Sequence, residues 1–337
     1  MDIDRILAAR DRFAPPFGRH AEGAIRRTPL LHAPALDRLA GRRVFVKAEC
    51  LQFTGSFKAR GGWAAVSALP PGTPGVLAMS SGNHAQGVAR AAAAHGMAAF
   101  IVMPLDAPGV KIANTRAWGA EVVLYDRGRE DRDALAAGLA AERGLALIPP
   151  YDHPEVVAGQ GVLGLELAEQ AEAAGIRAAE VLVPCGGGGL ASGVALALGA
   201  RAPGLRLRTV EPEGFDDMAR SLAAGAPQRN ARAAGSVCDA ILTPTPGRLT
   251  LPLLLDLARR GHVGPGLAVP DGAALRAVAA AFHHLRLVAE PGGAVALAAA
   301  LGLGGKDRAA DLPDTVICVV SGGNVDPDLF AEAIQAA

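Results

Sequence analysis

Lys58 is the residue best placed to do chemistry in this sequence. It lies in the stretch GSFKARGG, residues 55–62, after an expected strand at 44–49 and at the start of an expected helix. A lysine in the first helical turn meets unbonded N–H groups and the positive end of the helix dipole, which disfavour a second positive charge. By position alone, Lys58 is either an ordinary exposed lysine or one that is neutral or bound covalently as an imine.

The turn at residues 80–84 offers backbone N–H groups to a carboxylate. Its sequence, SSGNH, follows an expected strand at 75–79 and opens an expected helix at 83–95. The side chain of Asn83 can donate to, or accept from, an oxygen on an aromatic ring. Taken alone, however, this turn is better explained as an ordinary helix N-cap.

Four consecutive glycines, Gly186 to Gly189, separate an expected strand at 180–184 from an expected helix at 190–200. Without Cβ atoms their N–H groups stay accessible, which suits a phosphate. Val194 stands where a Walker A loop requires lysine, and Ala191 breaks the G-x-G-x-x-G pattern. The stretch therefore indicates a phosphate without a nucleotide signature, with a purely structural role as the alternative.

Two further turns carry polar groups. Ser321, followed by GGN, ends an expected strand at 315–320 and can donate to or accept from a ligand atom. The stretch EPEGFDD at 211–217, after an expected strand at 205–210, has four carboxylates. These could hold a hard divalent cation with the help of backbone carbonyls, or cap the next helix as solvated acids.

These turns fit one ligand when they are taken together. A lysine at a helix start, a phosphate-binding loop, an asparagine and a serine at strand ends suit a molecule with an aldehyde, a phosphate and a polar aromatic ring. Pyridoxal 5′-phosphate has all three, and a lysine Schiff base is its mark in proteins.

The elements that must position these turns alternate along the chain. Short apolar strands separated by helices predict an α/β protein with mostly parallel, doubly wound sheets, in which ligands bind at the carboxyl ends of strands. Two further helices are expected at 3–14 and 18–26, and a linker at 149–154. The chain therefore divides into two α/β units that meet near residue 150.

Composition excludes several classes of protein. The 337 residues contain 33 Lys and Arg and 33 Asp and Glu, with a pI near 7.1 and only 4% aromatic residues, which argues against nucleic acid as a partner. The four cysteines form no CxxC pair, as in a reduced, cytoplasmic protein. The acidic N-terminal residues do not resemble a signal peptide, and no apolar run reaches membrane-spanning length.

Several stretches together resemble one enzyme family. They are KAE at 47–49, GSFKARG at 55–61, SSGNH at 80–84, GGGGL at 186–190 and SGGN at 321–324, joined by GQG at 159–161 and Glu290-Pro291. From about Arg27 to Asn324, the chain resembles the serine/threonine dehydratase and serine racemase family of pyridoxal-phosphate enzymes (fold-type II, tryptophan synthase β-like). This resemblance implies a large cofactor-binding domain of residues 1–50 and 151–337. Residues 51–150 would form a smaller mobile domain, with the Lys58 helix at the junction.

The resemblance also implies a role for each matching residue. Lys58 would hold the cofactor covalently, Asn83 would contact its ring hydroxyl, and Ser321 would face its pyridine nitrogen. The implied cofactor-binding set is Phe57, Lys58, Asn83, Gly186, Gly187, Gly188, Gly189, Leu190, Glu290, Ser321 and Gly322.

Substrate and metal residues are implied in the same way. Ser81 matches the position at which racemases exchange a proton opposite the lysine, and the substrate carboxylate would be held by Ser80, Ser81, Gly82, Asn83 and His84. A divalent cation (Mg²⁺, or else Ca²⁺ or Mn²⁺) would be bound by Glu211, the Phe215 carbonyl and Asp217. Arg129 aligns with a mobile-domain arginine, although that stretch is divergent. The family resemblance further implies a homodimer that acts on a small amino acid.

The implied reaction is β-elimination from L-threonine or L-serine, giving a 2-oxo acid and ammonia. Departures from the family pattern at Cys238–Ile241 and Thr243–Gly247 leave 3-hydroxyaspartate or an aryl serine open as substrates. Amino-acid racemisation is the main alternative. A catalytically silent cofactor-binding protein and a β-replacement synthase are further ones, whereas a nicotinamide dehydrogenase lacks its fingerprint here.

Overall fold

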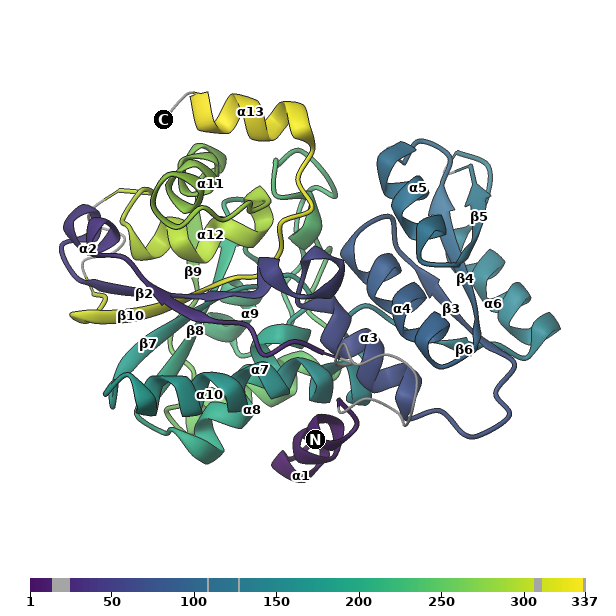
Figure 1. Cartoon of the computed structure of the whole chain (residues 1–337), viewed down its shortest axis with the longest axis horizontal. Coiled ribbons are helices and arrows are strands. Elements are labelled where there is room, and N and C mark those ends of the chain that lie inside the picture. The colour runs from purple at the N-terminus through teal and green to yellow at the C-terminus, as the bar shows by residue number, and fades with distance from the viewer. Residues whose placement is uncertain (14–24, 108, 127, 306–310, 336–337) are drawn as a thin grey trace.

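Two β-sheets with helices packed on both faces form the framework of the molecule (Figure 1). The computed structural model describes residues 1–13, 25–107, 109–126, 128–305 and 311–335. The two-sheet α/β architecture predicted from the alternation of elements is confirmed.

The larger sheet has six strands in the order β1-β2-β10-β7-β8-β9, all parallel except for β1, which runs antiparallel to β2. Its strands are β1 (Leu30–His32), β2 (Arg43–Ala48), β7 (Ala179–Pro184), β8 (Leu205–Pro212), β9 (Leu267–Val269) and β10 (Thr315–Val320). Successive side chains point to opposite faces. Val316 and Cys318 accordingly pack with the helices of one face, and Ile317 and Val319 with those of the other.

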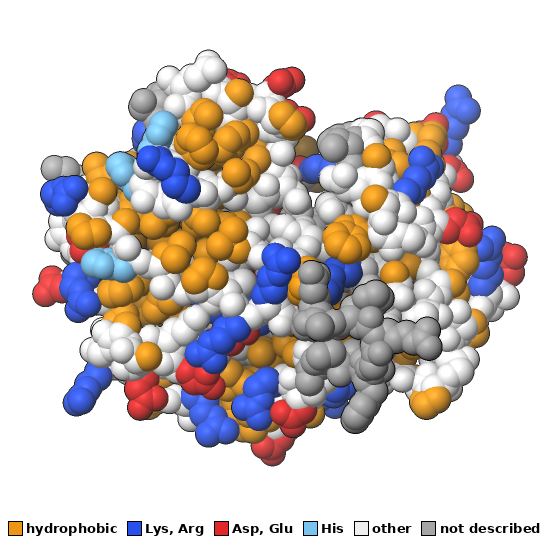
Figure 2. Space-filling model, viewed as in Figure 1, with side chains coloured by type: hydrophobic (Ala, Val, Ile, Leu, Met, Phe, Trp, Pro, Cys, Tyr) orange, Lys and Arg blue, Asp and Glu red, His pale blue; other side chains and the backbone are white. Residues whose placement is uncertain are grey.

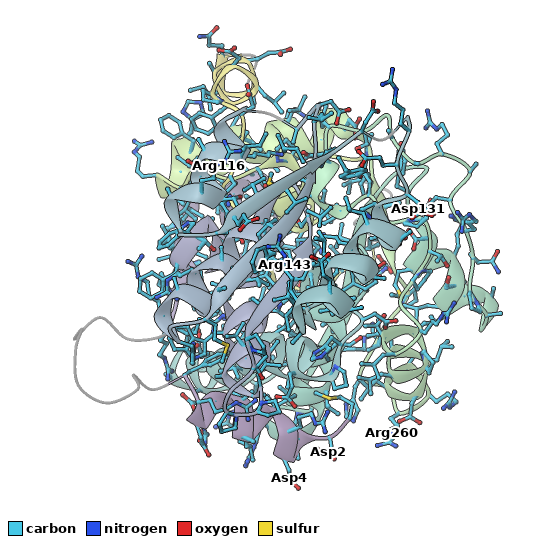
Figure 3. All side chains as sticks on the ribbon, turned by 90° about the vertical axis from the view of Figure 1, so that its right-hand side faces the viewer. Asp2, Asp4, Arg116, Asp131, Arg143 and Arg260 are labelled. Atoms are coloured by element: carbon cyan, nitrogen blue, oxygen red, sulfur yellow. The ribbon has the colours of Figure 1, made fainter. Side chains whose placement is uncertain are left out.

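The smaller sheet has four parallel strands in the order β5-β4-β3-β6. They are β3 (Gly75–Met79), β4 (Ala98–Pro104), β5 (Glu121–Tyr125) and β6 (Ala146–Leu147). Figure 3 looks onto this half of the molecule and labels Asp131 and Arg143 at the two ends of one covering helix. Asp131 caps that helix by accepting hydrogen bonds from the backbone N–H groups of residues 133 and 134.

The helices cover both faces of each sheet. The helices that precede β6 in the chain are α1 (Ile3–Asp11), α2 (Pro34–Ala40), α3 (Lys58–Ser67), α4 (Asn83–Ala94), α5 (Gly109–Ala117) and α6 (Arg132–Arg143), with 3-10 turns η1 (Glu49–Leu51) and η2 (Phe53–Gly55). The rest are α7 (Pro154–Ala173), α8 (Gly189–Arg201), α9 (Asp217–Ala224), η3 (Asp239–Ile241), α10 (Thr250–Arg259), α11 (Asp271–Leu285), α12 (Pro291–Ala300) and α13 (Pro327–Gln335). In the described part of the chain, none of these helices combines the length and apolar character needed to cross a lipid bilayer.

Most expected elements are present, with some corrections. The expected linker at 149–154 is shorter, because Pro154 takes the first position of α7, where proline loses no helical hydrogen bond. The short elements β1, α2 and β9 were not predicted. Residues 18–24 of the expected second helix lie outside the described residues.

Helix α7 packs closely against both helices that carry the predicted site. A Cβ on Gly159 would lie 2.6 Å from the carbonyl oxygen of Arg60 in α3, and one on Gly161 would lie 3.0 Å from that of Gly193 in α8. These glycines therefore let the backbones of three helices approach one another.

Buried charges tie α3 to the larger sheet. The Arg60 guanidinium donates to the Glu49 carboxylate at 2.7 Å and to the Glu166 carboxylate of α7 at 2.7 Å, and Lys47 of β2 also donates to Glu166. Lys47, Glu49 and Arg60 are fully buried. Their opposite charges compensate one another, which is the condition for burying them.

Candidate active site

A cavity of about 550 Å³ lies between the two sheets, at the carboxyl ends of their strands. Its walls include the start of α3, the turn after β3, the linker before α7, the glycine loop after β7, and residues 239–248. Every cofactor and substrate residue predicted from the sequence lines this cavity, except Gly322, which adjoins Glu290 and Asn83.

Lys58 begins α3, as predicted, and its side chain is half-buried in the cavity. Its Nζ donates to the carbonyl oxygen of Pro150 at 2.6 Å. Burial lowers the pKa of the Lys58 amine from 10.5 to about 8, although the nearby Glu290 carboxylate acts in the opposite direction. The amine is therefore charged below about pH 8 and neutral above it.

Asn83, the first residue of α4, has both ends of its side-chain amide hydrogen-bonded. Its Nδ2 donates to Oε1 of Glu290 at 2.6 Å, and its Oδ1 accepts from Nδ2 of Asn324 at 2.6 Å. Glu290 is only 5% exposed, and burial raises the pKa of its carboxyl to about 7 against the opposing hydrogen bond from Asn83.

The glycine loop leads into α8 without a side-chain cap. Gly188, with φ +92°, is the N-cap, so the first-turn N–H groups of α8 are not covered by a capping side chain. The carbonyl of Gly187 is bound instead by the Gly247 N–H at 3.2 Å and by the Thr250 hydroxyl at 2.5 Å. A Cβ on Gly188 would lie 2.6 Å from Met218, so the loop has no room for larger residues.

Ser321 ends β10 beside the segment that carries Lys58. Strands β10 and β2 run in parallel register, with Val320 opposite Ala48, and the Phe57 N–H donates to the Ser321 carbonyl at 3.1 Å. Ser321 is 3% exposed and lines the cavity. The first and last motifs of the chain thus meet at one edge of the larger sheet.

All five residues of the turn at 80–84 line the cavity, although the side chain of His84 is hydrogen-bonded to another segment. The His84 imidazole is buried and bonded through Nε2 to the Ile148 carbonyl at 2.8 Å. Burial, together with the charge of Lys58, lowers the pKa of His84 to about 3, so the ring is neutral. Any part that His84 takes in carboxylate binding would therefore come from its N–H at the start of α4.

The predicted metal residues lie at the end of β8 and the start of α9, outside the cavity lining. Both oxygens of Glu211 accept backbone N–H groups, from Met218 at 2.9 Å and Ala219 at 2.7 Å. Oδ2 of Asp217 is buried without a partner, an orphaned acceptor that would suit a cation. Within the described residues, no group of three or more His, Cys, Asp or Glu side chains could hold a metal.

Five charged residues of the cavity lining were not among the predicted site residues, namely Lys111, Arg132, Asp152, Asp239 and Arg248. Arg129, which aligned with a family arginine, lies outside the lining, with a side chain 86% exposed and 3.6 Å from Asp126. Asp131 is a helix N-cap residue in type and position, a signal that could have indicated that Arg132 opens α6.

Fold and cavity together define a pyridoxal-phosphate enzyme. A family model described as pyridoxal-phosphate dependent enzyme matches residues 21–322, nearly the whole chain, and the chain belongs to that family. The cofactor inferred from the turns that carry Lys58, Asn83, the four glycines and Ser321 is thereby confirmed.

Several characterised proteins are similar to this chain over nearly their whole length. The chain is 40% identical to an L-threo-3-hydroxyaspartate ammonia-lyase of Pseudomonas sp., over 93% of this chain and 95% of the relative. It is 36% identical to a serine racemase of Oryza sativa subsp. indica, over 99% and 94%. The crystal structure of a threonine deaminase from T.th. superposes with a TM-score of 0.87 at 44% identity, covering 97% of this chain and 99% of that one.

The cavity fits this cofactor chemically. The uncapped start of α8 behind a loop that excludes side chains suits a phosphate, and the Lys58 amine suits an aldehyde. Asn83 and Ser321 offer the polar groups that a pyridine ring with a hydroxyl requires.

Proposed function

We propose that this enzyme is an ammonia-lyase, which converts a 3-hydroxy amino acid such as L-threonine or L-serine into a 2-oxo acid and ammonia. The observation that carries the proposal is the Lys58 amine, with its lowered pKa, in one cavity with Ser81, Asn83 and Ser321. Relatives named as threonine and hydroxyaspartate ammonia-lyases support the same reaction.

Pyridoxal phosphate, when bound, stabilises negative charge at the substrate's α-carbon. Lys58 would hold the cofactor aldehyde in the resting enzyme. Once the amino group of the substrate has taken its place, the freed Lys58 amine would take the α-proton, a role that a lysine pKa near 8 favours. The N–H groups at the start of α4 would hold the substrate carboxylate. The β-hydroxyl then leaves with a proton as water, and water adds back to release ammonia and leave a 2-oxo acid.

Ser321 would bias the outcome toward elimination. Its hydroxyl would hydrogen-bond to the pyridine nitrogen, but it cannot keep that nitrogen protonated as a carboxylate would. Negative charge at the α-carbon is then short-lived, which favours loss of the β-hydroxyl over transamination. The remaining predicted contacts, from Phe57, Leu190, Glu290 and Gly322, would complete the cofactor site.

Racemisation is a second candidate because Ser81 lines the same cavity as Lys58. A serine on the opposite face of the substrate could return the proton there, and several relatives are named serine racemase. A 3-hydroxyaspartate is the acidic substrate to consider, since the cationic side chains of Lys111 and Arg132 also line the cavity.

The finer parts of the assignment are proposals as well. Glu211, the Phe215 carbonyl and Asp217 would hold a divalent cation, and residues 51–150 would move as a smaller domain.

A cytoplasmic location is supported by four free, buried cysteines. A homodimer is supported by hydrophobic side chains that gather over α2, α11 and α12 (Figure 2), with Leu39 and Val288 exposed.

A substrate panel with matched variants tests the function. We expect the protein to release 2-oxo acid and ammonia in equal amounts from at least one hydroxy amino acid, while the configuration of the remaining substrate is followed by chiral chromatography. Lys58→Ala should lower turnover by at least about a thousandfold, because both its proposed roles are lost. Arg129→Ala, outside the cavity, should match the unaltered protein. Racemised substrate without oxo acid would instead identify a racemase, and full turnover by Lys58→Ala would refute the site.

A further inference from the structure

Asn324 joins three segments that are far apart in the sequence, and none of the roles proposed above uses it. Its Nδ2 donates to the Thr54 carbonyl oxygen at 2.7 Å and to Oδ1 of Asn83 at 2.6 Å. Thr54 lies in η2, Asn83 at the start of α4, and Asn324 in the turn after β10. The side chain therefore bridges both sheets beside the cavity.

The chemistry of these partners determines which way the Asn83 amide points. A carbonyl oxygen can only accept, so the Asn324 atom that faces Thr54 must be the nitrogen. The same nitrogen faces Asn83, whose nearer atom must then be its oxygen. The Asn83 nitrogen is left to face Oε1 of Glu290, to which it donates at 2.6 Å. A flipped Asn83 amide would set two nitrogen donors against each other.

Glu290 cannot determine this orientation by itself. Burial raises the pKa of its carboxyl to about 7, so near neutral pH the group exists in both protonation states. A carboxylate requires the Asn83 nitrogen as its partner, whereas a carboxylic acid could donate to the Asn83 oxygen instead. Only a partner that donates in both states can hold the amide one way round, and Asn324 is such a partner.

The backbone around Asn324 is shaped to hold it. Thr54 has φ +58°, a left-handed conformation that is costly for a β-branched residue. The next residue, Gly55, has φ +71°, and a Cβ there would lie 2.6 Å from Oδ1 of Asn324. The Gly323 N–H donates to the Gly55 carbonyl at 2.9 Å. The strained turn thus places one carbonyl oxygen against Asn324 and leaves room for its amide.

We propose that Asn324 is a positioning residue, which keeps the amide nitrogen of Asn83 turned toward Glu290 and toward the hydroxyl group on the pyridine ring of the cofactor. Asn83 has two N–H groups and lines the cavity, so one serves Glu290 and the other serves the ligand. A reversed amide would face the ring hydroxyl with its oxygen in place of an N–H, so it could no longer stabilise that hydroxyl in its ionised form. The inference concerns cofactor binding and is independent of which substrate the enzyme uses.

Asn324→Asp tests the proposal, because it preserves size and removes both donated hydrogens. We expect the visible absorption band of the bound cofactor to shift and the diluted holoenzyme to lose cofactor about tenfold faster. Asn114→Asp makes the same chemical change at an exposed position of α5 and should alter neither property. An unchanged band and release rate in Asn324→Asp would overturn the proposal.

A double-mutant cycle separates positioning from a general effect on the fold. In the Asn83→Ala background there is no amide to orient, so Asn324→Asp should change the band and release rate no further. A change of the same factor in that background would mean that Asn324 supports only the fold, and the proposal would be wrong. If the aspartate variant does not fold, Asn324→Ser, which retains one hydroxyl donor, is tested in the same cycle and should give a smaller change with the same dependence on Asn83.

Discussion

Lys58 lies in an environment that opposes its positive charge. Burial lowers the pKa of its amine to about 8, from 10.5 for a solvated lysine. Only a neutral amine attacks an aldehyde, and a lowered pKa means that the neutral form predominates above about pH 8. The covalent capture of pyridoxal phosphate by cofactor-free protein should therefore speed up about tenfold per pH unit below pH 8 and level off above it. Stopped-flow absorbance measures this rate.

Free lysine acetylated on its α-amino group provides the comparison, since its capture rate should continue to rise until the pH approaches 10.5. A protein rate that still increases steeply above about pH 9.5 would show that the Lys58 amine has an ordinary pKa. Among the described groups, those that affect Lys58 most are its own burial and Glu290, so Glu290→Gln should lower the midpoint of the rise slightly.

At the scale of elements, α7 holds the lysine helix and the glycine-loop helix together through glycines. Gly193 of α8 lies so close to α7 that a Cβ there would be 2.6 Å from the Gly161 nitrogen. Gly193→Ala should lower the free energy of unfolding by about 1–3 kcal/mol, because backbone atoms on both helices would have to separate. Urea denaturation followed by circular dichroism measures the change.

Gly138 in α6 is the matched control. It is also a helical glycine, but nothing lies within 4 Å of a Cβ built on it. Gly138→Ala should raise the free energy of unfolding by about 0.5–1 kcal/mol, because alanine loses less conformational entropy in a helix. Equal changes in the free energy of unfolding for Gly193→Ala and Gly138→Ala would show that the α7–α8 contact can accommodate a methyl group.

The elements that carry the cofactor residues could be predicted because their signals are local. The motifs that contain Lys58, Asn83, the four glycines and Ser321 each come after a short apolar strand, and parallel strands bring their carboxyl ends to one edge of a sheet. Lys111, Arg132 and Asp239 gave no such signal, because none of them lies in a turn directly after a strand; they belong to α5, α6 and η3. They converge only because two sheets face each other, which depends on packing between segments distant in sequence. The bridge from Asn324 to Asn83 and Thr54 escaped prediction for the same reason.

At the scale of the whole molecule, one ion pair spans the cavity between the two halves. Lys111 Nζ, on α5 beside the smaller sheet, lies 2.9 Å from Oδ2 of Asp239, in η3 near the larger sheet, with side chains 24% and 63% exposed. Asp239→Ala should raise the KM for substrate about two- to fivefold, because the two halves of the molecule lose a partly exposed ion pair that joins them beside the cavity, while stability changes by less than about 0.5 kcal/mol. Steady-state kinetics and thermal unfolding provide the two measurements.

Two comparisons make this result specific. Lys111→Ala should raise KM by a similar factor, and the double variant should add little, because either substitution removes the same pair. Asp256→Ala removes a carboxylate that pairs with two arginines of its own helical segment, Arg259 and Arg260, and should leave KM unchanged. Additive effects of the Lys111 and Asp239 substitutions would show that they act separately on the substrate.

The pairing of β2 with β10 sets the order in which the protein can become active during its synthesis. Lys58 follows β2, near the start of the chain, whereas Ser321 follows β10, near its end, and the two strands are direct neighbours in the larger sheet. A chain still being made on the ribosome can complete the smaller sheet, whose strands all lie between residues 75 and 147. It cannot complete the cofactor site until β10 has emerged. Loading with pyridoxal phosphate therefore has to wait for the synthesis of β10, and nascent chains that lack this strand stay catalytically silent.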